Sequence, residues 1–403
     1  MSKTRPKFQT ESIIKTWPMV RLGEVCNEIK DRIQSSKIAV GEYVTTDSMV
    51  KDCGGIVQAG YVPSDVGLVE YHKGDVLIAN IRPYLKKIWL ADHDGGCSSD
   101  VVVFRSNIDG LSSEYLYSVL SQDAYFEYVM QKPRGTKMPR GDRDWMKEFR
   151  FPLPTLTEQR AIVARLEREL AAVEKMKNGF EALAETAKAE FKAELKEVFE
   201  EISCGGAETR RLGDTFRFID YRGMTPNKIA TGVPLITAKN IRFGYMDYRE
   251  RFYISEEDYA KRQTRGVARC GDILFTTEAP MGYVALADQK RFSTGQRIIA
   301  FQWPNATEHN NRYFLYYFMS DVFQDQVREN ASGATAQGIK SSRLVNLSVL
   351  IPECQKQSQV VARLDSAKAR AEKLEAKARE GVAVCETMRK AILKEAFDLR
   401  RKG

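Results

Sequence analysis

Apolar residues recur every three or four positions along a proline-free stretch between Thr157 and about Phe199. Alanine, glutamate, lysine and leucine, all strong helix formers, dominate this stretch. The apolar positions are Leu166, Leu170, Val173, Phe180, Ala184, Ala187, Phe191 and Val198, and they are interrupted at Lys177 and Glu194. This spacing is typical of a coiled-coil seam. It predicts one helix of about 43 residues and roughly 65 Å, far longer than the mean helix of a globular domain.

The pattern recurs near the end of the chain. Its second seam contains Leu364, Ala367, Ala371, Leu374, Ala378, Cys385, Met388, Ile392 and Leu399. The start of the first helix also reappears 198 positions later, as Gln159, Val163, Ala164, Arg165 and Leu166 correspond to Gln357, Val361, Ala362, Arg363 and Leu364. Each helix follows a short strand-like run that ends in proline, at Pro154 and Pro352. The chain therefore contains a two-fold internal repeat.

The segments before the two helices repeat as well. Runs rich in apolar and β-branched residues, at 43–46, 75–81, 86–91 and 99–105, alternate with turn residues and predict mixed strands and turns. Residues 112–131 have a helical apolar period, and residues 311–329 repeat it. Arg211–Phe216 repeats Arg21–Cys26, and Gly271–Leu274 repeats Gly74–Leu77. These repeated segments match while the residues between them differ, which indicates two copies of one scaffold with different surfaces.

These patterns predict an α+β protein with two similar globular units, separated by two long antiparallel coiled-coil helices in a pseudo-two-fold internal repeat. The helices are expected to run antiparallel because the intervening unit brings the chain back, so that one chain imitates a symmetric dimer. The predicted boundaries are a tail at 1–17, a globular unit at 18–156, a long helix at 157–203, a second globular unit at 204–353 and a second long helix at 354–403.

Composition agrees with a folded protein of two or three domains, because 403 residues with 43% hydrophobic content suffice for sizeable cores. No apolar run approaches the roughly 18 residues that cross a bilayer, and the first residues lack the apolar core of a secretory signal. The seven cysteines are scattered and form no CxxC pair, which favours reduced thiols in the cytoplasm. A formal charge of +8 suits a polyanionic partner, but it equally suits a soluble protein with a slight basic excess.

The sequence lacks the common catalytic motifs. There is no phosphate-binding P-loop, GxGxxG, HExxH or GxSxG, and no Asn/Asp-Pro-Pro-aromatic sequence of the kind that holds a flipped base in amino-methyltransferases. His93 and Cys97 could contact a metal, but no second pair stands in register, so a surface turn is the better interpretation. His72 and His309 add no further candidate site. Two scaffolds and two long helices indicate recognition or spacing rather than catalysis.

Basic residues gather in loop-like stretches that also carry glycine or proline. The candidates for DNA contact in the first unit are Arg82, Lys86, Lys87, Arg134, Lys137, Arg140 and Arg143. Those in the second unit are Arg222, Lys239, Asn240, Arg242 and Lys340. Such loops suit phosphate contacts and base-edge hydrogen bonds, and we expect Asn240 and Arg242 to read bases because these residue types match adenine and guanine. For any single basic residue, a solvated surface charge remains the simpler interpretation. The basic residues of the loop 132–143, taken together, favour a functional role.

The chain resembles the specificity subunits of type I restriction-modification systems. The resemblance is carried by the opening WPMVRLGEV, the junction FPLPTLTEQRAIVARL, the stretches GDTFRFIDYRGMTPNK and PLITAKNIRFG, and the second junction from Leu350 to Leu364, where Glu353–Gln357 departs from the usual form. It extends from Trp17 to the end. The resemblance implies that each globular unit is a target recognition domain that reads one half of a split, asymmetric site in double-stranded DNA.

The resemblance also implies partners. The subunit itself would be non-catalytic and cytoplasmic, without cofactor or metal, and the two long helices would set the unread spacer between the half-sites. Two methyltransferase subunits would bring S-adenosylmethionine, and two restriction subunits would bring ATP-driven cleavage with Mg²⁺. The recogniser would then position the duplex so that a partner flips and methylates an adenine.

Two alternatives come from other classes. A coiled-coil scaffold without a DNA role explains the helices equally well, but it does not explain why two copies diverge in their loops and keep their joints. A fused recognition and catalysis enzyme is disfavoured because the chain has no room for a catalytic domain.

Overall fold

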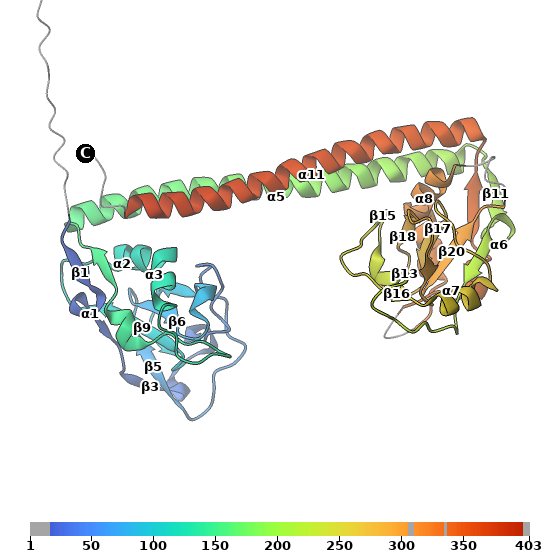
Figure 1. The fold of residues 1–403 in the computed structure, drawn as a ribbon. Coiled ribbons are helices and arrows are strands. Elements are labelled where there is room, and N and C mark those ends of the chain that lie inside the picture. The colour runs from blue at the N-terminus through green and yellow to red at the C-terminus, as the bar shows by residue number, and fades with distance from the viewer. Residues whose placement is uncertain (1–16, 305–309, 334–336, 398–403) are drawn as a thin grey trace, which may run out of the picture. The chain divides into compact units, whose positions relative to one another are not determined.

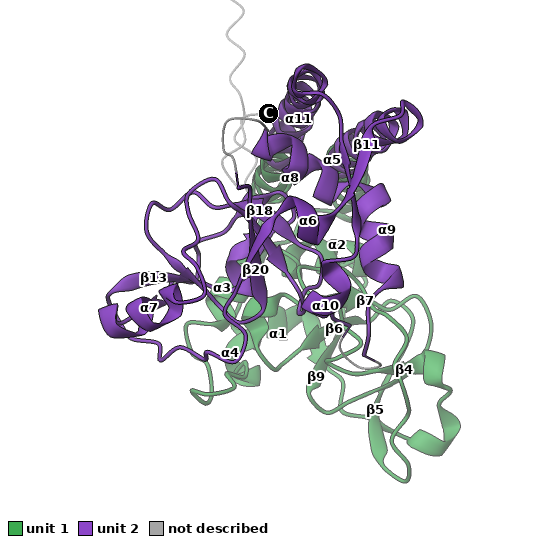
Figure 2. Ribbon diagram, turned by 90° about the vertical axis from the view of Figure 1, so that its right-hand side faces the viewer, with its two compact units in different colours: residues 1–180, 380–403 green, residues 181–379 purple. Residues whose placement is uncertain are grey.

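A computed structural model describes residues 17–304, 310–333 and 337–397. The chain forms two compact units, unit 1 with residues 1–180 and 380–403 and unit 2 with residues 181–379 (Figure 2). The predicted tail therefore lies outside the described residues, except for Trp17. Each long helix contributes one part to each unit.

Unit 1 contains two four-stranded sheets and a two-stranded pair (Figure 1). Strand β1 (Met19–Arg21) pairs antiparallel with β10 (Arg150–Pro152). The main sheet is antiparallel in the order β2 (Cys26–Glu28), β9 (Val101–Ser106), β6 (Val76–Ala79) and β7 (Ile88–Leu90). The second sheet has the order β3 (Arg32–Gln34), β5 (Gly67–Tyr71), β8 (Gly95–Cys97) and β4 (Tyr43–Val44), with β4 parallel to β8. Its helices are α1 (Leu22–Val25), α2 (Ser113–Leu120), α3 (Asp123–Val129) and α4 (Arg143–Lys147).

Unit 2 repeats this order of elements. Strand β11 (Glu208–Arg211) pairs with β21 (Ser348–Ile351), and the main sheet is β12 (Arg217–Asp220), β20 (Ile298–Gln302), β17 (Ile273–Thr276) and β18 (Val284–Leu286). A three-stranded sheet contains β16 (Tyr253–Ile254), β13 (Val233–Ile236) and β19 (Ser293–Thr294), and β14 (Ile241–Arg242) forms a hairpin with β15 (Tyr245–Met246). The helices are α6 (Leu212–Thr215), α7 (Glu256–Gln263), α8 (Asn311–Met319), α9 (Asp321–Glu329) and α10 (Ser341–Leu344).

The internal repeat is confirmed at the level of pairing. The parallel pair β4·β8 of unit 1 corresponds to β13·β19 of unit 2, and both main sheets follow one strand order. The segment before Gly271 is longer in unit 2 than the corresponding segment before Gly74 in unit 1, and helix α7 lies within it. The prediction of one helix at 112–131 and one at 311–329 is wrong, because each stretch forms two helices that break near Ser121 and Ser320. Each serine hydroxyl donates to the carbonyl of a preceding tyrosine and so competes with continuation of the helix.

Alternation along the strands of unit 1 builds two cores, one on each face of the main sheet. Val76 and Ile78 face helices α2 and α3, whereas Leu77 and Ala79 face the second sheet. Figure 1 shows α2 and α3 between the main sheet and the long helices. In unit 2 the corresponding core is more aromatic, with every residue from Tyr313 to Met319 of α8 buried.

A buried glutamine fixes the start of each long helix, α5 (Leu156–Cys204) and α11 (Cys354–Ala396). Gln159 is fully buried; its Oε1 accepts from the Ser112 amide at 2.9 Å, and its Nε2 donates to the Gly110 and Pro154 carbonyls. Gln357 is equally buried and bonds the Asn310 amide and the Pro352 carbonyl. Because Ser112 and Asn310 cap α2 and α8, each glutamine joins its long helix to the aromatic helix of the same copy.

The long helices pair antiparallel within each unit. In unit 1 the Phe180 ring packs where a Cβ on Gly381 would stand 2.5 Å from it, and Arg165 lies 3.7 Å from Glu395. In unit 2 Arg363 forms ion pairs with three glutamates of α5, namely Glu194, Glu197 and Glu201. Glu194 therefore stabilises the pair rather than merely interrupting the seam.

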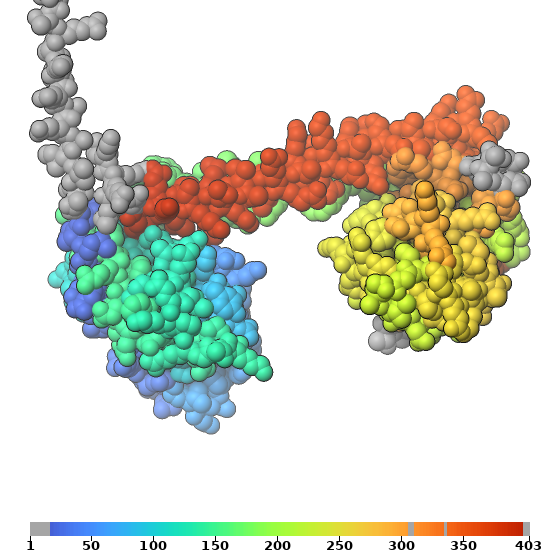
Figure 3. Space-filling view, viewed as in Figure 1, coloured from blue at the N-terminus to red at the C-terminus, as the bar shows by residue number. Residues whose placement is uncertain are grey.

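Two details of the second seam differ from the prediction. Gly381 belongs to the seam because it makes room for Phe180, whereas Met388 is 40% exposed and does not. Figure 3 shows α11 uncovered on the face turned to the viewer, as the polar positions between seam residues require. Leu399 and residues 398–403 of the predicted helix lie outside the described residues. None of the helices in the described part of the chain is long and apolar enough to cross a membrane.

The two copies differ in one buried ion pair. In unit 1 Asp75 accepts two hydrogen bonds from Arg105, each 2.7 Å long. In unit 2 Asp272 stands at the equivalent position, but Gln302 replaces the arginine and donates at 3.1 Å, and the Arg269 amide donates at 2.7 Å. Burial raises the pKa of Asp272 to about 6, and the hydrogen bonds compensate only in part.

This difference predicts a pH dependence in unit 2. The folded pKa of Asp272 lies above the unfolded value of about 3.9, so its contribution to stability is fully present below pH ~4 and is lost as the pH rises through about 6. Gln302→Arg should supply the missing cation and reduce this loss. The measurement is the change in thermal midpoint of unit 2 between pH 4.5 and 7, followed by hydrogen exchange of β17 and β20. Arg105→Gln is the reciprocal control and should introduce the same loss in unit 1; equal pH profiles for wild type and Gln302→Arg would contradict the assignment.

Candidate nucleic-acid interface

One edge of unit 1 joins a strained turn to a closed basic loop. The turn follows β6, and Arg82 adopts a left-handed φ of 51° before Pro83. The loop, here called loop 1 (Arg134–Arg140), is closed by Arg134 and Arg140, which exchange main-chain hydrogen bonds of 2.8 and 2.9 Å. The Arg82 amide donates to the Pro139 carbonyl at 2.7 Å, and the Gly141 amide donates to the Asn80 carbonyl at 3.0 Å. The turn and loop 1 therefore form one backbone platform.

Unit 2 has a similar backbone platform. Ala279 has a φ of 48° before Pro280, and the Ile339 amide donates to the Thr277 carbonyl at 3.0 Å. The corresponding loop, here called loop 2, runs from Ser332 to Gly338, whose main chains exchange hydrogen bonds of 2.8 and 3.0 Å; residues 334–336 lie outside the described residues. Loop 1 is rich in arginine and lysine, whereas the sequence of loop 2 consists of small and uncharged polar residues. The two copies thus carry different residues in loops that are closed by equivalent main-chain hydrogen bonds.

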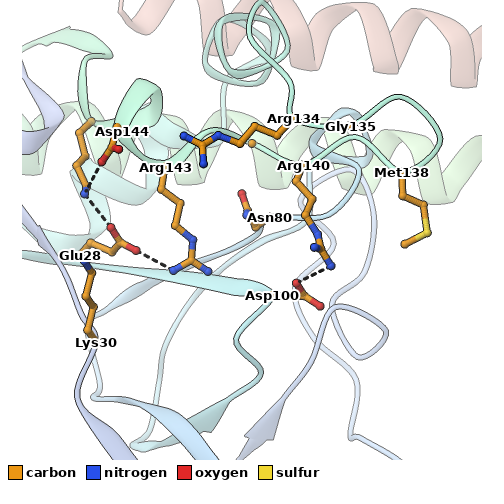
Figure 4. A pocket seen from close by; sticks show the side chains of 12 residues that line it. Glu28, Lys30, Asn80, Asp100, Arg134, Gly135, Met138, Arg140, Arg143 and Asp144 are labelled. Carbon is orange, nitrogen blue, oxygen red and sulfur yellow. Dashed lines mark hydrogen bonds and ion pairs between the residues drawn. The ribbon is translucent and has the colours of Figure 1, made fainter.

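The platform of unit 1 borders a cleft of about 840 Å³, shown in Figure 4. Five cations line it, namely Lys30, Arg134, Arg140, Arg143 and Lys147, together with the three carboxylates Glu28, Asp100 and Asp144. The remaining lining residues are Asn80, Gly135, Met138 and Gly141. Five positive and three negative side chains leave an excess of two positive charges, which suits an anionic partner.

Carboxylates hold most of these cations in place. Glu28, whose side chain is 4% exposed, lies 2.8 Å from Arg143 and 2.9 Å from Lys147. Burial alone would raise the pKa of Glu28, but the hydrogen bonds from Lys147 and Arg143 outweigh it and keep that pKa below its usual value. Arg140 lies 3.2 Å from Asp100, and Arg134 lies 2.8 Å from Asp142. The arginines are therefore oriented before any ligand arrives.

The structure places the predicted basic residues of unit 1 in two groups. Arg82, Arg134, Lys137, Arg140 and Arg143 meet at the turn, loop 1 and the start of α4, and the first four are exposed. Lys86 instead bonds Asp123 of α3 at 2.6 Å, and Lys87 donates to the Thr46 carbonyl at 2.5 Å. Neither lysine lines the cleft, and both are engaged with the protein.

The predicted residues of unit 2 lie in two places. Arg222 lies 3.2 Å from Asp220 and donates to the Ser341 hydroxyl, and Lys340 is exposed next to that serine. The second place is the hairpin β14–β15 and the turn before it, where Lys239 pairs with Glu250 at 2.9 Å and Arg242 with Asp247 at 3.1 Å. Hydrogen bonds from Arg249, with a smaller contribution from Arg242, hold the pKa of Asp247 well below its usual value.

The structure corrects the prediction that Asn240 reads a base. Its side chain is 2% exposed, and Oδ1 accepts from the amide and hydroxyl of Thr237, both at 2.9 Å. Nδ2 donates to the carbonyls of Asp247 and Glu250 at 3.0 and 2.7 Å. All its hydrogen-bonding capacity is used to hold the turn, so none remains for a base edge.

Sequence reasoning missed several residues of the unit 1 cleft, namely Glu28, Lys30, Asn80, Asp100 and Lys147. Asn80 follows directly after the buried strand β6 and precedes the turn at Arg82. This position at the end of a strand could have marked Asn80 as a candidate site residue. The weak metal candidate is not supported, since Cys97 is buried in the core and no group of three or more ligands is placed to hold a metal within the described residues.

A family model described as "Type I restriction modification DNA specificity domain" matches residues 14–179 and 205–382. The MjaVIII type I restriction enzyme specificity subunit of Methanocaldococcus jannaschii is 22% identical over 87% of this chain and 85% of that protein. The EcoDI specificity subunit of Escherichia coli is 30% identical over 102 residues, and this match covers 25% of the chain but only 22% of the relative.

Two solved structures extend the similarity to the fold. A chain from a study of complex assembly and conformational transition in a type I restriction-modification system superposes with a TM-score of 0.74 at 26% identity, covering 95% of this chain and 97% of that one. The crystal structure of the HsdS subunit from Thermoanaerobacter tengcongensis gives a TM-score of 0.57 at 25% identity, covering 95% and 96%. Both likenesses include the two units and both long helices, since they extend over nearly the whole chain.

The structural role of Asn240 can be tested by substitution. Asn240→Ala should lower the free energy of unfolding of unit 2 by about 1–3 kcal/mol, because the Thr237 amide and two buried carbonyls lose their partner. Lys239→Ala is the matched control and should change it by at most about 1 kcal/mol, since its ion pair with Glu250 is exposed. Denaturant unfolding of both variants measures the difference. Equal stability of Asn240→Ala and wild type would return Asn240 to the list of candidate readers.

Proposed function

The chain belongs to the type I restriction-modification DNA specificity family, and on that premise we propose that it is the DNA-reading subunit of such an enzyme. Each unit would read one half of a split, asymmetric site in double-stranded DNA. The subunit would hold the duplex for methyltransferase and restriction subunits that carry out the chemistry. The family match covers residues 14–179 and 205–382, so the proposal applies to both units.

The observation that carries the proposal is the repeated platform with different side chains. In both units a positive-φ residue before a proline follows the strand, and an equivalent hydrogen bond, Gly141 to Asn80 or Ile339 to Thr277, joins this turn to the end of a closed loop. A scaffold protein would have no reason to keep this backbone and to exchange nearly every side chain on it. Two readers of different half-sites require both properties, because the backbone fixes the position on the duplex and the side chains fix the sequence.

We infer two kinds of DNA contact from the exposure and the ion pairs of the basic side chains. Exposed cations such as Lys137 and Lys340 stand on or beside the loops and suit phosphate oxygens. Arginines held by carboxylates, such as Arg143 and Arg242, have restricted orientations and suit the edges of bases. Exposed cations would therefore position the duplex, and held side chains would discriminate among sequences.

We expect the chemistry to reside in partners. Two methyltransferase subunits would supply S-adenosylmethionine, and two restriction subunits would supply ATP-dependent cleavage with Mg²⁺. The chain itself would need no cofactor and would act in the cytoplasm, where these subunits meet DNA. Its contribution to methylation is to fix the register of the duplex so that a partner can extrude the target adenine.

The alternative is a coiled-coil scaffold without a DNA role. Gel mobility shift with the methyltransferase partner present separates the two, using DNA selected by the complex from a random pool and unselected DNA as probes. Preferential retention of the selected DNA supports the proposal. Assembly of the complex without any sequence preference would favour the scaffold.

Substitutions should distinguish the two kinds of contact. Lys137→Ala should weaken binding to every sequence alike and lower the salt slope by about one unit. Arg242→Ala should instead relax one position of one half-site, at a cost of about 1–3 kcal/mol. Lys73→Ala, an exposed lysine outside loop 1, serves as the control. The measurement is methylation across a library of half-site variants, and a uniform loss for Arg242→Ala would reassign it to the backbone.

The long helices should act as a ruler. Removing one heptad from each, Ala182–Lys188 of α5 and the facing Lys373–Arg379 of α11, keeps both seams in phase and shortens the pair by about 10 Å. The complex should then select a site with the same half-sites and a spacer shorter by roughly three base pairs. Deletion from α5 alone is the control and should fail to assemble because the seams fall out of register. An unchanged spacer in a folded double deletion would remove the ruler role.

A further inference from the structure

The cleft of unit 1 contains one uncharged polar side chain, that of Asn80. It is 7% exposed, and its Oδ1 is buried without a hydrogen-bond donor in the part of the chain that the structure describes. A buried acceptor without a partner is unfavourable, and such groups in folded proteins call for an explanation. Figure 4 shows the amide among the arginines of the cleft.

Each carboxylate that lines the cleft near Asn80 already has a cation beside it. Glu28 accepts from Arg143 and Lys147, which use both of its oxygens. Asp100 pairs with Arg140, and Asp144 lies 3.3 Å from Lys147. Asn80 differs from these carboxylates because its Oδ1 is buried and has no donor among the described residues.

The backbone of Asn80 is fixed at the joint between the turn and loop 1. Its amide donates to the Asp100 carbonyl at 2.8 Å, and its carbonyl accepts from Gly141 at 3.0 Å. A Cβ on Gly141 would stand 2.8 Å from Oδ1, so only glycine leaves the amide this space. Because Oδ1 is buried next to Gly141, contact with a base requires a small displacement of the segment around Gly141.

The hydrogen-bond donors on the major-groove edges of bases are the amino groups of adenine and cytosine. A carboxamide fits adenine better, since its oxygen accepts from N6 while its nitrogen donates to N7. We propose that Asn80 reads an adenine in the half-site of unit 1. This inference rests on the proposed function, and it adds that the base recognised by Asn80 is adenine.

Unit 2 offers an internal comparison. Thr277 occupies the position equivalent to Asn80 and is 4% exposed, but its hydroxyl donates to the Arg297 carbonyl at 3.2 Å. The equivalent group in unit 2 is therefore already satisfied within the protein. The adenine contact belongs to unit 1 alone, in keeping with an asymmetric site.

The test uses the full complex with the methyltransferase partner and a library of half-site variants. Asn80→Ala should lose about 10- to 100-fold of the preference for adenine at one position of the unit 1 half-site and leave the other half-site unchanged. Asn80→Asp, which keeps the shape and the acceptor but cannot donate to N7, should shift the preference at that position toward cytosine. Lys73→Ala, at an exposed lysine outside loop 1, is the control and should change no preference. Thermal unfolding of each variant reports whether the fold is retained.

A base analogue makes the test independent of folding defects. Replacing the implicated adenine by purine, which lacks the N6 amino group, should weaken binding of the wild type but not weaken Asn80→Ala further. Equal losses in both proteins, an unchanged preference in Asn80→Ala, or a loss that is uniform over all sequences would each overturn the assignment. A wild-type complex without any sequence preference would instead refute the proposed function, and the inference with it.

Discussion

The structure depends on apolar contacts that make the long helices part of both cores. In unit 1, Val163 and Leu166 of α5 and Phe397 next to α11 are buried with the aromatic side chains of α2 and α3. In unit 2, Val198 and Phe199 of α5 and Leu364 of α11 close the core against α8. A helix that merely connected domains could slide or rotate. These helices cannot, because a shift in register would expose apolar surface in each unit.

The same contacts explain the buried glutamines and the glycine of the seam. Gln159 and Gln357 satisfy main-chain groups exposed at the junctions where strand, aromatic helix and long helix meet. Gly381, unfavourable within a helix by about 1 kcal/mol, is required because Phe180 fills the place of a side chain. The contact between Phe180 and Gly381 helps to set the register of the helix pair within unit 1.

The two units share main-chain hydrogen bonds at their platforms but differ in the side chains there. The main chain of each platform is held by hydrogen bonds between main-chain groups, which do not depend on side-chain identity. Carboxylates such as Glu28 and Asp247 then orient individual arginines. Such a division allows the side chains, and with them the DNA sequence that is read, to change without rebuilding the fold.

The sequence by itself determined the repeat, the two long helices and the α+β class, because coiled-coil spacing and strand alternation are local periodicities that repeat at a constant offset. It also located the basic loops as a set. Only the tertiary structure joined the turn at Arg82 to Pro139, and only it separated two asparagines of similar appearance. The side chain of Asn240 is fully hydrogen-bonded to Thr237, Asp247 and Glu250, whereas Oδ1 of Asn80 has no donor among the described residues. A side chain is available for recognition only if its hydrogen bonds are not used within the fold, and those partners are set by packing between segments distant in sequence.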